Sequence, residues 1–93
     1  MPKGKHPTNA LNAKRVSKLV DPGRYTDGNG LYLIVVKSGA KRWVLRCMVG
    51  GRRRDMGLGG LKTVSLAKAR QLAQSYRAIA RSGGDPLANR RRE

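Results

Sequence analysis

Seven lysine and arginine side chains lie between Lys37 and Arg54, interleaved with apolar residues. These residue types can bind an anionic partner, because arginine pairs with the acceptor edge of guanine, both cations contact phosphates, and apolar groups contact the methyl group of thymine. The whole chain of 93 residues carries 21 Lys and Arg against 5 Asp and Glu, a net charge of +16. Such a charge attracts nucleic acid or an anionic membrane surface, at the cost of self-repulsion in the folded state.

Other chemistries find little support in the sequence. One cysteine, Cys47, and one histidine, His6, cannot build a zinc site on their own, and a single cysteine allows no intrachain disulfide. No phosphate-binding GxxxxGK[ST] loop is present, and we interpret the glycine-rich run 57–60 as a turn. The longest strictly apolar run, residues 31–36, is too short to cross a bilayer. We therefore expect no catalytic residue, no cofactor and no metal site, and neither a membrane nor a small molecule as partner.

Three strands are predicted to position the cations, at residues 31–36, 42–49 and 53–58. Gly50-Gly51 predicts a two-residue hairpin turn between the last two strands, because both central positions of a type I′ turn need a positive φ. This turn places Leu45 opposite Met56 and Trp43 opposite Leu58. Directly opposed residues lie on the same face of a sheet, so we predict that these four side chains form the core face.

The hairpin between the first two strands is less constrained. Its loop contains Ser38-Gly39-Ala40, and an odd loop length of three or five residues puts Leu31, Leu33 and Val35 on the core face. A four-residue loop would exchange the two faces, but we favour the odd length because a left-handed Gly39 suits a bulged turn. The preceding residues 25–30 are rich in Asp, Asn and Gly, and we interpret them as a turn-rich entry to the first strand.

Two helices are predicted to flank the sheet. Asn12 can cap a short helix over residues 13–20, and Ser65 can cap a longer one with apolar side chains at helical spacing from Leu66 to Ala80. The longer helix needs the core face of the sheet to bury its apolar stripe. The predicted fold is α+β, a three-stranded antiparallel sheet packed on one main C-terminal helix, with a short N-terminal helix. We expect residues 1–10 to be a disordered basic tail, residues 11–86 the domain, and residues 87–93 the start of a linker.

The helix would leave the second face of the sheet, here called the outer face, uncovered. A mixture of arginine and apolar side chains suits the DNA major groove, which a β-sheet can enter. The groove-contacting residues predicted on this face are Tyr32, Ile34, Arg42, Val44, Arg46 and Arg53. The cations predicted to contact flanking phosphates, at strand ends and turns, are Lys37, Lys41, Arg52 and Arg54.

Two residues of the outer face have open roles. Tyr32 either contacts the groove or packs in the ordinary way at the sheet edge. Asp55, predicted opposite Arg46, either reads a base or forms an ion pair that orients this arginine, and we favour the ion pair.

Five segments of the chain carry a family resemblance. They are Asp27–Leu33, Ser38–Trp43, Gly57–Gly59, Val64–Arg70 and Gly84–Pro86. In this order and at this spacing they resemble the N-terminal arm-type DNA-binding domain of prophage and genomic-island tyrosine recombinases (integrases), over roughly residues 11–90. Two positions depart from the family pattern: Lys68 replaces the Glu of a capping box, and Ile34 occupies a position that is often polar.

The resemblance implies a DNA-binding role in the bacterial cytoplasm. Such integrases cut and rejoin DNA through a tyrosine in a separate C-terminal domain, so this chain would be a non-catalytic fragment that binds double-stranded arm sites and supports DNA integration and recombination beside other protomers. The alternative is a small basic RNA-binding protein of the ribosomal type. An aromatic content of 4% argues against base stacking on single-stranded RNA.

Overall fold

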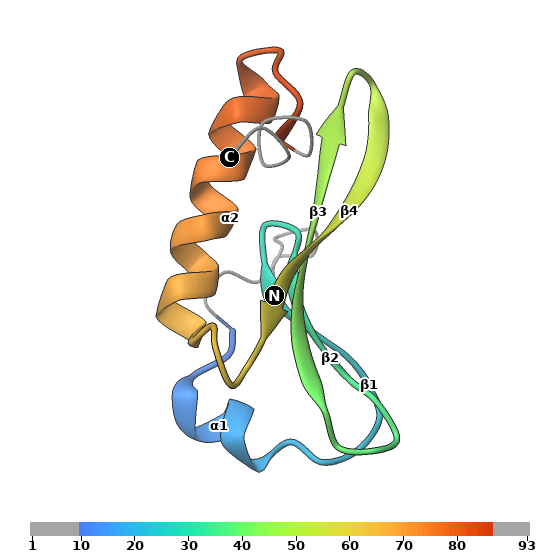
Figure 1. The fold of residues 1–93 in the computed structure, drawn as a ribbon, viewed down its shortest axis with the longest axis vertical. Helices are drawn as coiled ribbons and strands as arrows, with labels where there is room; N and C mark the ends of the chain where they lie inside the picture. Colours follow the sequence, from blue (N-terminus) through green and yellow to red (C-terminus); the bar gives the residue numbers. More distant parts are fainter. Residues whose placement is uncertain (1–9, 87–93) are drawn as a thin grey trace, which may run out of the picture.

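A four-stranded antiparallel sheet is packed on a long helix in the computed structural model, which describes residues 10–86 (Figure 1). The elements are α1 (Ala13–Lys18), β1 (Gly23–Gly28), β2 (Leu31–Val35), β3 (Lys41–Val49), β4 (Arg52–Gly60) and α2 (Leu66–Arg81). The strands lie in the sheet in chain order. The α+β class is confirmed. The predicted linker, and the predicted tail apart from Ala10, lie outside the described residues.

The prediction of three strands is wrong, because β1 adds a fourth. It pairs with β2, with Tyr25 opposite Leu33 and Thr26 opposite Tyr32. The turn residues that suggested a loop belong to the β1–β2 connection itself, where residues 28–30 all have positive φ. The segment Arg24-Tyr25-Thr26 just before them alternates between the two faces of the sheet, as in any strand.

Most of the predicted register is confirmed. Five residues, 36–40, separate the paired residues Val35 and Lys41, and Gly39 has a φ of +91°, so the loop length is odd as expected. Leu45 lies opposite Met56 as predicted. Beyond that pair the prediction fails, because a bulge next to Trp43 places it opposite Gly59 rather than Leu58. The run 57–60 is therefore the end of β4 and not a turn.

The bulge gives a test at two neighbouring glycines. Gly59 has a φ of +121°, and an added Cβ would lie 2.8 Å from Cγ2 of Val64, whereas a Cβ at Gly57 would meet nothing within 4 Å. We expect Gly59→Ala to lower the free energy of unfolding by about 1–2 kcal/mol through backbone strain. Gly57→Ala, the matched control, should change it by less than about 0.5 kcal/mol. Urea unfolding of both variants measures the difference, and equal losses would contradict the bulge.

The core lies between the sheet and α2. Trp43, Leu33 and Leu45 are fully buried, and Ala69 and Ala73 of α2 are buried against the sheet. Small alanine side chains let the helix approach the large Trp43, whose indole Nε1 donates a hydrogen bond of 2.8 Å to the Val64 carbonyl. A buried indole N–H needs such a partner, so this bond also fixes the loop that precedes α2.

The short helix α1 ends earlier than predicted. Asn12 caps it as expected, its side-chain oxygen accepting from the Arg15 amide at 2.8 Å. At the other end, Lys41 Nζ donates to the carbonyls of Val16 and Ser17, at 2.9 and 3.1 Å. Cations stabilise the carbonyl end of a helix. Val20, expected in the apolar stripe, lies beyond the helix and is 72% exposed.

A partly buried ion pair joins the N-terminal segment, β1 and α2. Asp27 is 2% exposed, and its carboxylate accepts from Arg70 Nε and Nη2 at 2.9 Å each and from the Leu11 amide at 2.9 Å. Arg70 Nη2 also donates to the Leu11 carbonyl at 2.8 Å, and the Ala10 amide donates to the Asp27 carbonyl at 3.0 Å. Burial opposes ionisation, but the hydrogen bonds from Arg70 and Leu11 outweigh it and hold the pKa of Asp27 below its ordinary value.

Candidate nucleic-acid interface

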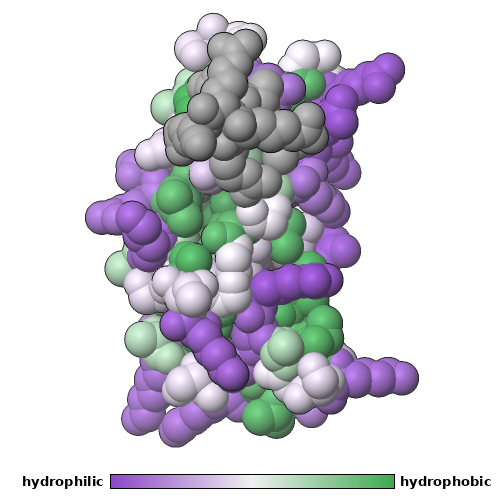
Figure 2. Space-filling model, viewed as in Figure 1, coloured by the Kyte–Doolittle hydropathy of each residue, from purple (hydrophilic) through white to green (hydrophobic). Residues whose placement is uncertain are grey.

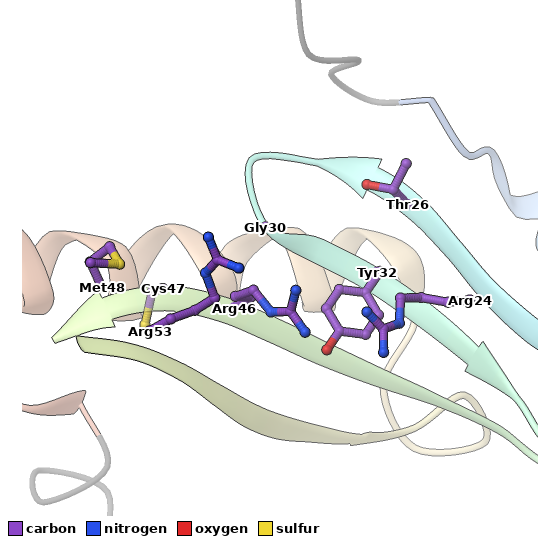
Figure 3. Close-up of a pocket in the computed structure, with 8 residues that line it drawn as sticks. All are labelled: Arg24, Thr26, Gly30, Tyr32, Arg46, Cys47, Met48 and Arg53. Atoms are coloured by element: carbon purple, nitrogen blue, oxygen red, sulfur yellow. The ribbon is translucent and has the colours of Figure 1, made fainter.

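The outer face of the sheet combines residues from all four strands. Strand alternation and register place Arg24 and Thr26 of β1 on the same face as Tyr32 of β2, and Arg46 of β3 opposite Asp55 of β4. In Figure 3 the helix lies behind the sheet while Arg24, Tyr32 and Arg46 lie in front of it. Both helices of the described residues lie on the other side of the sheet (Figure 1).

Tyr32 is the centre of a charged cluster on this face. Its ring is 4.9 Å from Cζ of Arg24 and 5.7 Å from Cζ of Arg46, distances at which a guanidinium is attracted to the ring. Its hydroxyl donates to Asp55 Oδ2 at 3.2 Å. These neighbours leave Tyr32 only 6% exposed. Tyr32 therefore packs within the sheet and supports the arginines on either side of it.

Asp55 and Arg46 form the favoured ion pair. Arg46 Nε lies 2.8 Å from Oδ1 of Asp55, and Nη2 lies 3.3 Å from Oδ2. The hydrogen bonds and charge of Arg46 hold the pKa of Asp55 below its ordinary value, and Asp55 raises the pKa of Arg46 in return. Both side chains stay accessible, at 34% exposed for Arg46 and 48% for Asp55. The pair is thus a fixed but solvent-reachable feature of the outer face.

The structure brings six of the ten predicted contact residues together on the outer face. They are Tyr32, Ile34, Arg42, Val44, Arg46 and Arg53. Arg42 and Arg53 are exposed, Ile34 is half-buried and Val44 is 8% exposed. The outer face therefore mixes cationic and apolar residues, as the sequence predicted, with Tyr32 and Val44 buried beneath the exposed arginines.

The four cations expected at phosphates lie off the outer face, near strand ends and turns as predicted. Lys37 is exposed in the β2–β3 loop. Arg52 and Arg54 are exposed near the β3–β4 turn, and Arg54 lies opposite Cys47 on the helix side of the sheet. Lys41 also belongs to the helix side and holds the end of α1. We therefore assign Lys41 a structural role.

Two residues of the outer face were missed by sequence reasoning, Arg24 and Thr26. They line a shallow hollow there together with Gly30, Tyr32, Arg46, Cys47, Met48 and Arg53 (Figure 3). Both residues were missed because β1 was not predicted, although the alternation of Arg24-Tyr25-Thr26 is a pattern that indicates a strand. In Figure 2 hydrophilic side chains project from both long edges of the view, so hydrophilicity alone does not distinguish one side of the domain from the other.

Comparison with known proteins identifies the family. Residues 8–93 match the family model described as Arm DNA-binding domain. The chain belongs to the arm DNA-binding domain family. Two relatives are each 39% identical to it over 66 residues: an integrase of Shigella phage Sf6 and the prophage integrase IntS of Escherichia coli K12. The match covers 71% of this chain and 17% of each relative, so the arm domain corresponds to a small part of those integrases.

Family membership confirms the resemblance seen in the sequence, and the structure explains part of it. Asp27 and Arg70 belong to two of the five resembling segments, and they meet in the partly buried ion pair. In this chain those two residues are therefore structural. Within residues 10–86, neither helix is long and apolar enough to cross a membrane, and no three His, Cys, Asp or Glu side chains gather as a metal site would require.

Proposed function

We propose that the chain binds double-stranded DNA by placing the outer face of its sheet in the major groove. In this proposal it is the arm-site module of a phage-type integrase, and other domains and protomers carry out site-specific recombination. The names of the family and of both relatives support DNA binding and integration. The module itself holds DNA and leaves strand cleavage to the rest of the integrase.

One observation carries the proposal: the outer face presents four arginines, Arg24, Arg42, Arg46 and Arg53, among apolar side chains. An ordinary solvated face is mostly polar, with apolar residues scattered singly. The major groove offers acceptor edges to arginine and thymine methyl groups to apolar side chains. A sheet face of this composition matches both, whereas attraction to phosphates alone would need no apolar residues.

The β3–β4 hairpin supports the same placement. Arg53 lies on the outer face while Arg52 and Arg54 flank it on the opposite face, and all three are exposed. Figure 1 shows the end of this hairpin projecting away from β1 and β2. With Arg53 toward the bases, the flanking arginines reach phosphates at the groove edge, which fix orientation without reading sequence.

Paired arginine variants test the proposal. Against a duplex selected from a random library, Arg53→Ala should weaken binding by about 1–2 kcal/mol and relax base preference locally. Arg15→Ala, an exposed arginine of α1 on the helix side of the sheet, should have a much smaller effect that is equal for all sequences, because only screened long-range charge reaches the DNA. Fluorescence anisotropy measures both.

Two outcomes would contradict this function. Equal losses in the two variants would indicate a nonspecific cationic surface. Tighter binding to the matching RNA duplex than to DNA would favour the RNA-binding alternative. Affinity for duplex DNA should also fall steeply with salt, since bound phosphates release counterions, and a flat salt dependence would remove the electrostatic basis of the proposal.

A further inference from the structure

We infer that Asp55 is a specificity-determining residue that holds Arg46 in position to recognise a guanine. This inference rests on the proposed function and adds to it one named interaction. The reason for it is a negative charge on a surface proposed to bind an anion. The chain has only 5 acidic residues against 21 cations, yet one of them, in the edge strand β4, lies on the surface proposed to face a polyanion, and it is 48% exposed.

An exposed carboxylate on this surface repels phosphates and lowers affinity for every DNA sequence. As a stabilising ion pair it contributes little, because exposed pairs typically add almost nothing to folding stability. The loss of DNA affinity that Asp55 causes is therefore not offset by a gain in folding stability. What the carboxylate does provide is a fixed position for the arginine opposite it.

The geometry of the pair leaves the recognition edge of Arg46 available. The two bonds to Asp55 use the Nε–H and one N–H of Nη2. A guanidinium carries five N–H donors in a rigid fork, so the Nη1 amino group and the second N–H of Nη2 lie outside the ion pair. Those two nitrogens form the edge that can donate to O6 and N7 of one guanine.

Tyr32 completes the support. Its hydroxyl donates to Asp55 Oδ2 at 3.2 Å, and its ring lies 5.7 Å from Cζ of Arg46. Tyr32 is itself 6% exposed in an inner strand of the sheet. The carboxylate is thus held by a buried side chain, and the arginine is held by the carboxylate. Asp55 and Tyr32 act on DNA through Arg46, so both are positioning residues.

The experiment compares base preference at single positions. A random duplex library is first selected with the wild-type chain, and Arg46→Ala then identifies the position that Arg46 reads, as the guanine whose preference is lost. There the wild type should prefer guanine by roughly 5- to 100-fold. Asp55→Asn should reduce this preference to less than about 3-fold at the same position, and Tyr32→Phe, which removes only the hydroxyl, should reduce it partly.

A second readout moves in the opposite direction. Because Asp55→Asn removes a negative charge, affinity for an unrelated duplex at low salt should rise by roughly 2- to 3-fold. A position read by Arg42, located with Arg42→Ala, is the matched control, and its preference should not change in Asp55→Asn. A merely structural role of Asp55 would lower both affinities together and would leave the base preference unaltered.

Each failure points to a different conclusion. If Arg46→Ala relaxes no position, or Asp55→Asn leaves the guanine preference within twofold of wild type, the inference is overturned while DNA binding stands. If Asp55→Asn instead relaxes a separate cytosine position, Asp55 itself reads a base and the positioning role is wrong. If the wild type selects no duplex at all, the proposed function fails first.

Discussion

Replacing Trp43 with alanine is expected to lower the free energy of unfolding by about 3–5 kcal/mol. The side chain is fully buried in the centre of the core, and its loss opens a cavity between β3 and α2. The Val64 carbonyl also loses the indole hydrogen bond. A domain is stabilised by only about 5–15 kcal/mol in total, so the variant should melt far below the wild type or lose its cooperative transition.

Circular dichroism is the suitable measurement, because Trp43 is the single tryptophan and the variant has no tryptophan fluorescence. Val20→Ala provides the control: Val20 is 72% exposed, so its truncation should change stability by less than about 0.5 kcal/mol. Trp43→Phe should lie between the two. A Trp43→Ala variant that unfolds at the wild-type urea concentration would show that the sheet and helix do not pack through this residue.

Replacing Arg70 with leucine is expected to destabilise the domain by about 3 kcal/mol at neutral pH. Breaking a buried ion pair leaves the remaining charge, here the carboxylate of Asp27, without compensation. Arg70 itself is 34% exposed, which places the effect at the lower end of the usual range of about 3–5 kcal/mol for such losses. The variant also loses the bond from Arg70 to the Leu11 carbonyl, so the N-terminal segment should loosen first.

The pH dependence separates charge from packing in this variant. The pKa of Asp27 is lowered by folding, so its contribution is present above the ordinary value of 3.8 and is lost as the pH falls through the folded-state value. The stability difference between wild type and Arg70→Leu should therefore be largest near neutral pH and shrink below about pH 4. Urea unfolding at both pH values measures it, and a constant difference would mean that Arg70 acts by packing alone.

The Gly50-Gly51 turn shows why much of the fold could be predicted from the sequence. Both residues have positive φ, +57° and +77°, and a two-residue turn of this kind fixes the pairing of the strands on either side. Counting outward from these two glycines is enough to place Arg46 opposite Asp55. The register failed only at Trp43, where β4 contains a bulge. Gly59 there has a positive φ and little room beside Val64, and no local sequence pattern indicates this.

The other features that the sequence did not predict also depend on contacts between segments that are distant in the chain. β1 is short and ends in turn residues, so its pairing with β2 is visible only in the assembled sheet. Asp27 and Arg70 are 43 positions apart, and the sequence around each residue does not indicate that the two form an ion pair. Lys41 lies two residues before Trp43 in the same strand, so it could be placed on the helix side of the sheet. The position of α1, which decides what the Lys41 ammonium contacts, could not be predicted.

The outermost strand β4 has a consequence for the behaviour of the protein at high concentration. An unpaired strand edge is a template for joining another chain. Here that edge begins with three consecutive arginines and ends in a glycine-rich bulge. Like charges and a local twist both oppose pairing of two such edges. Copies of the domain crowded side by side on neighbouring sites should therefore remain separate sheets instead of fusing into one.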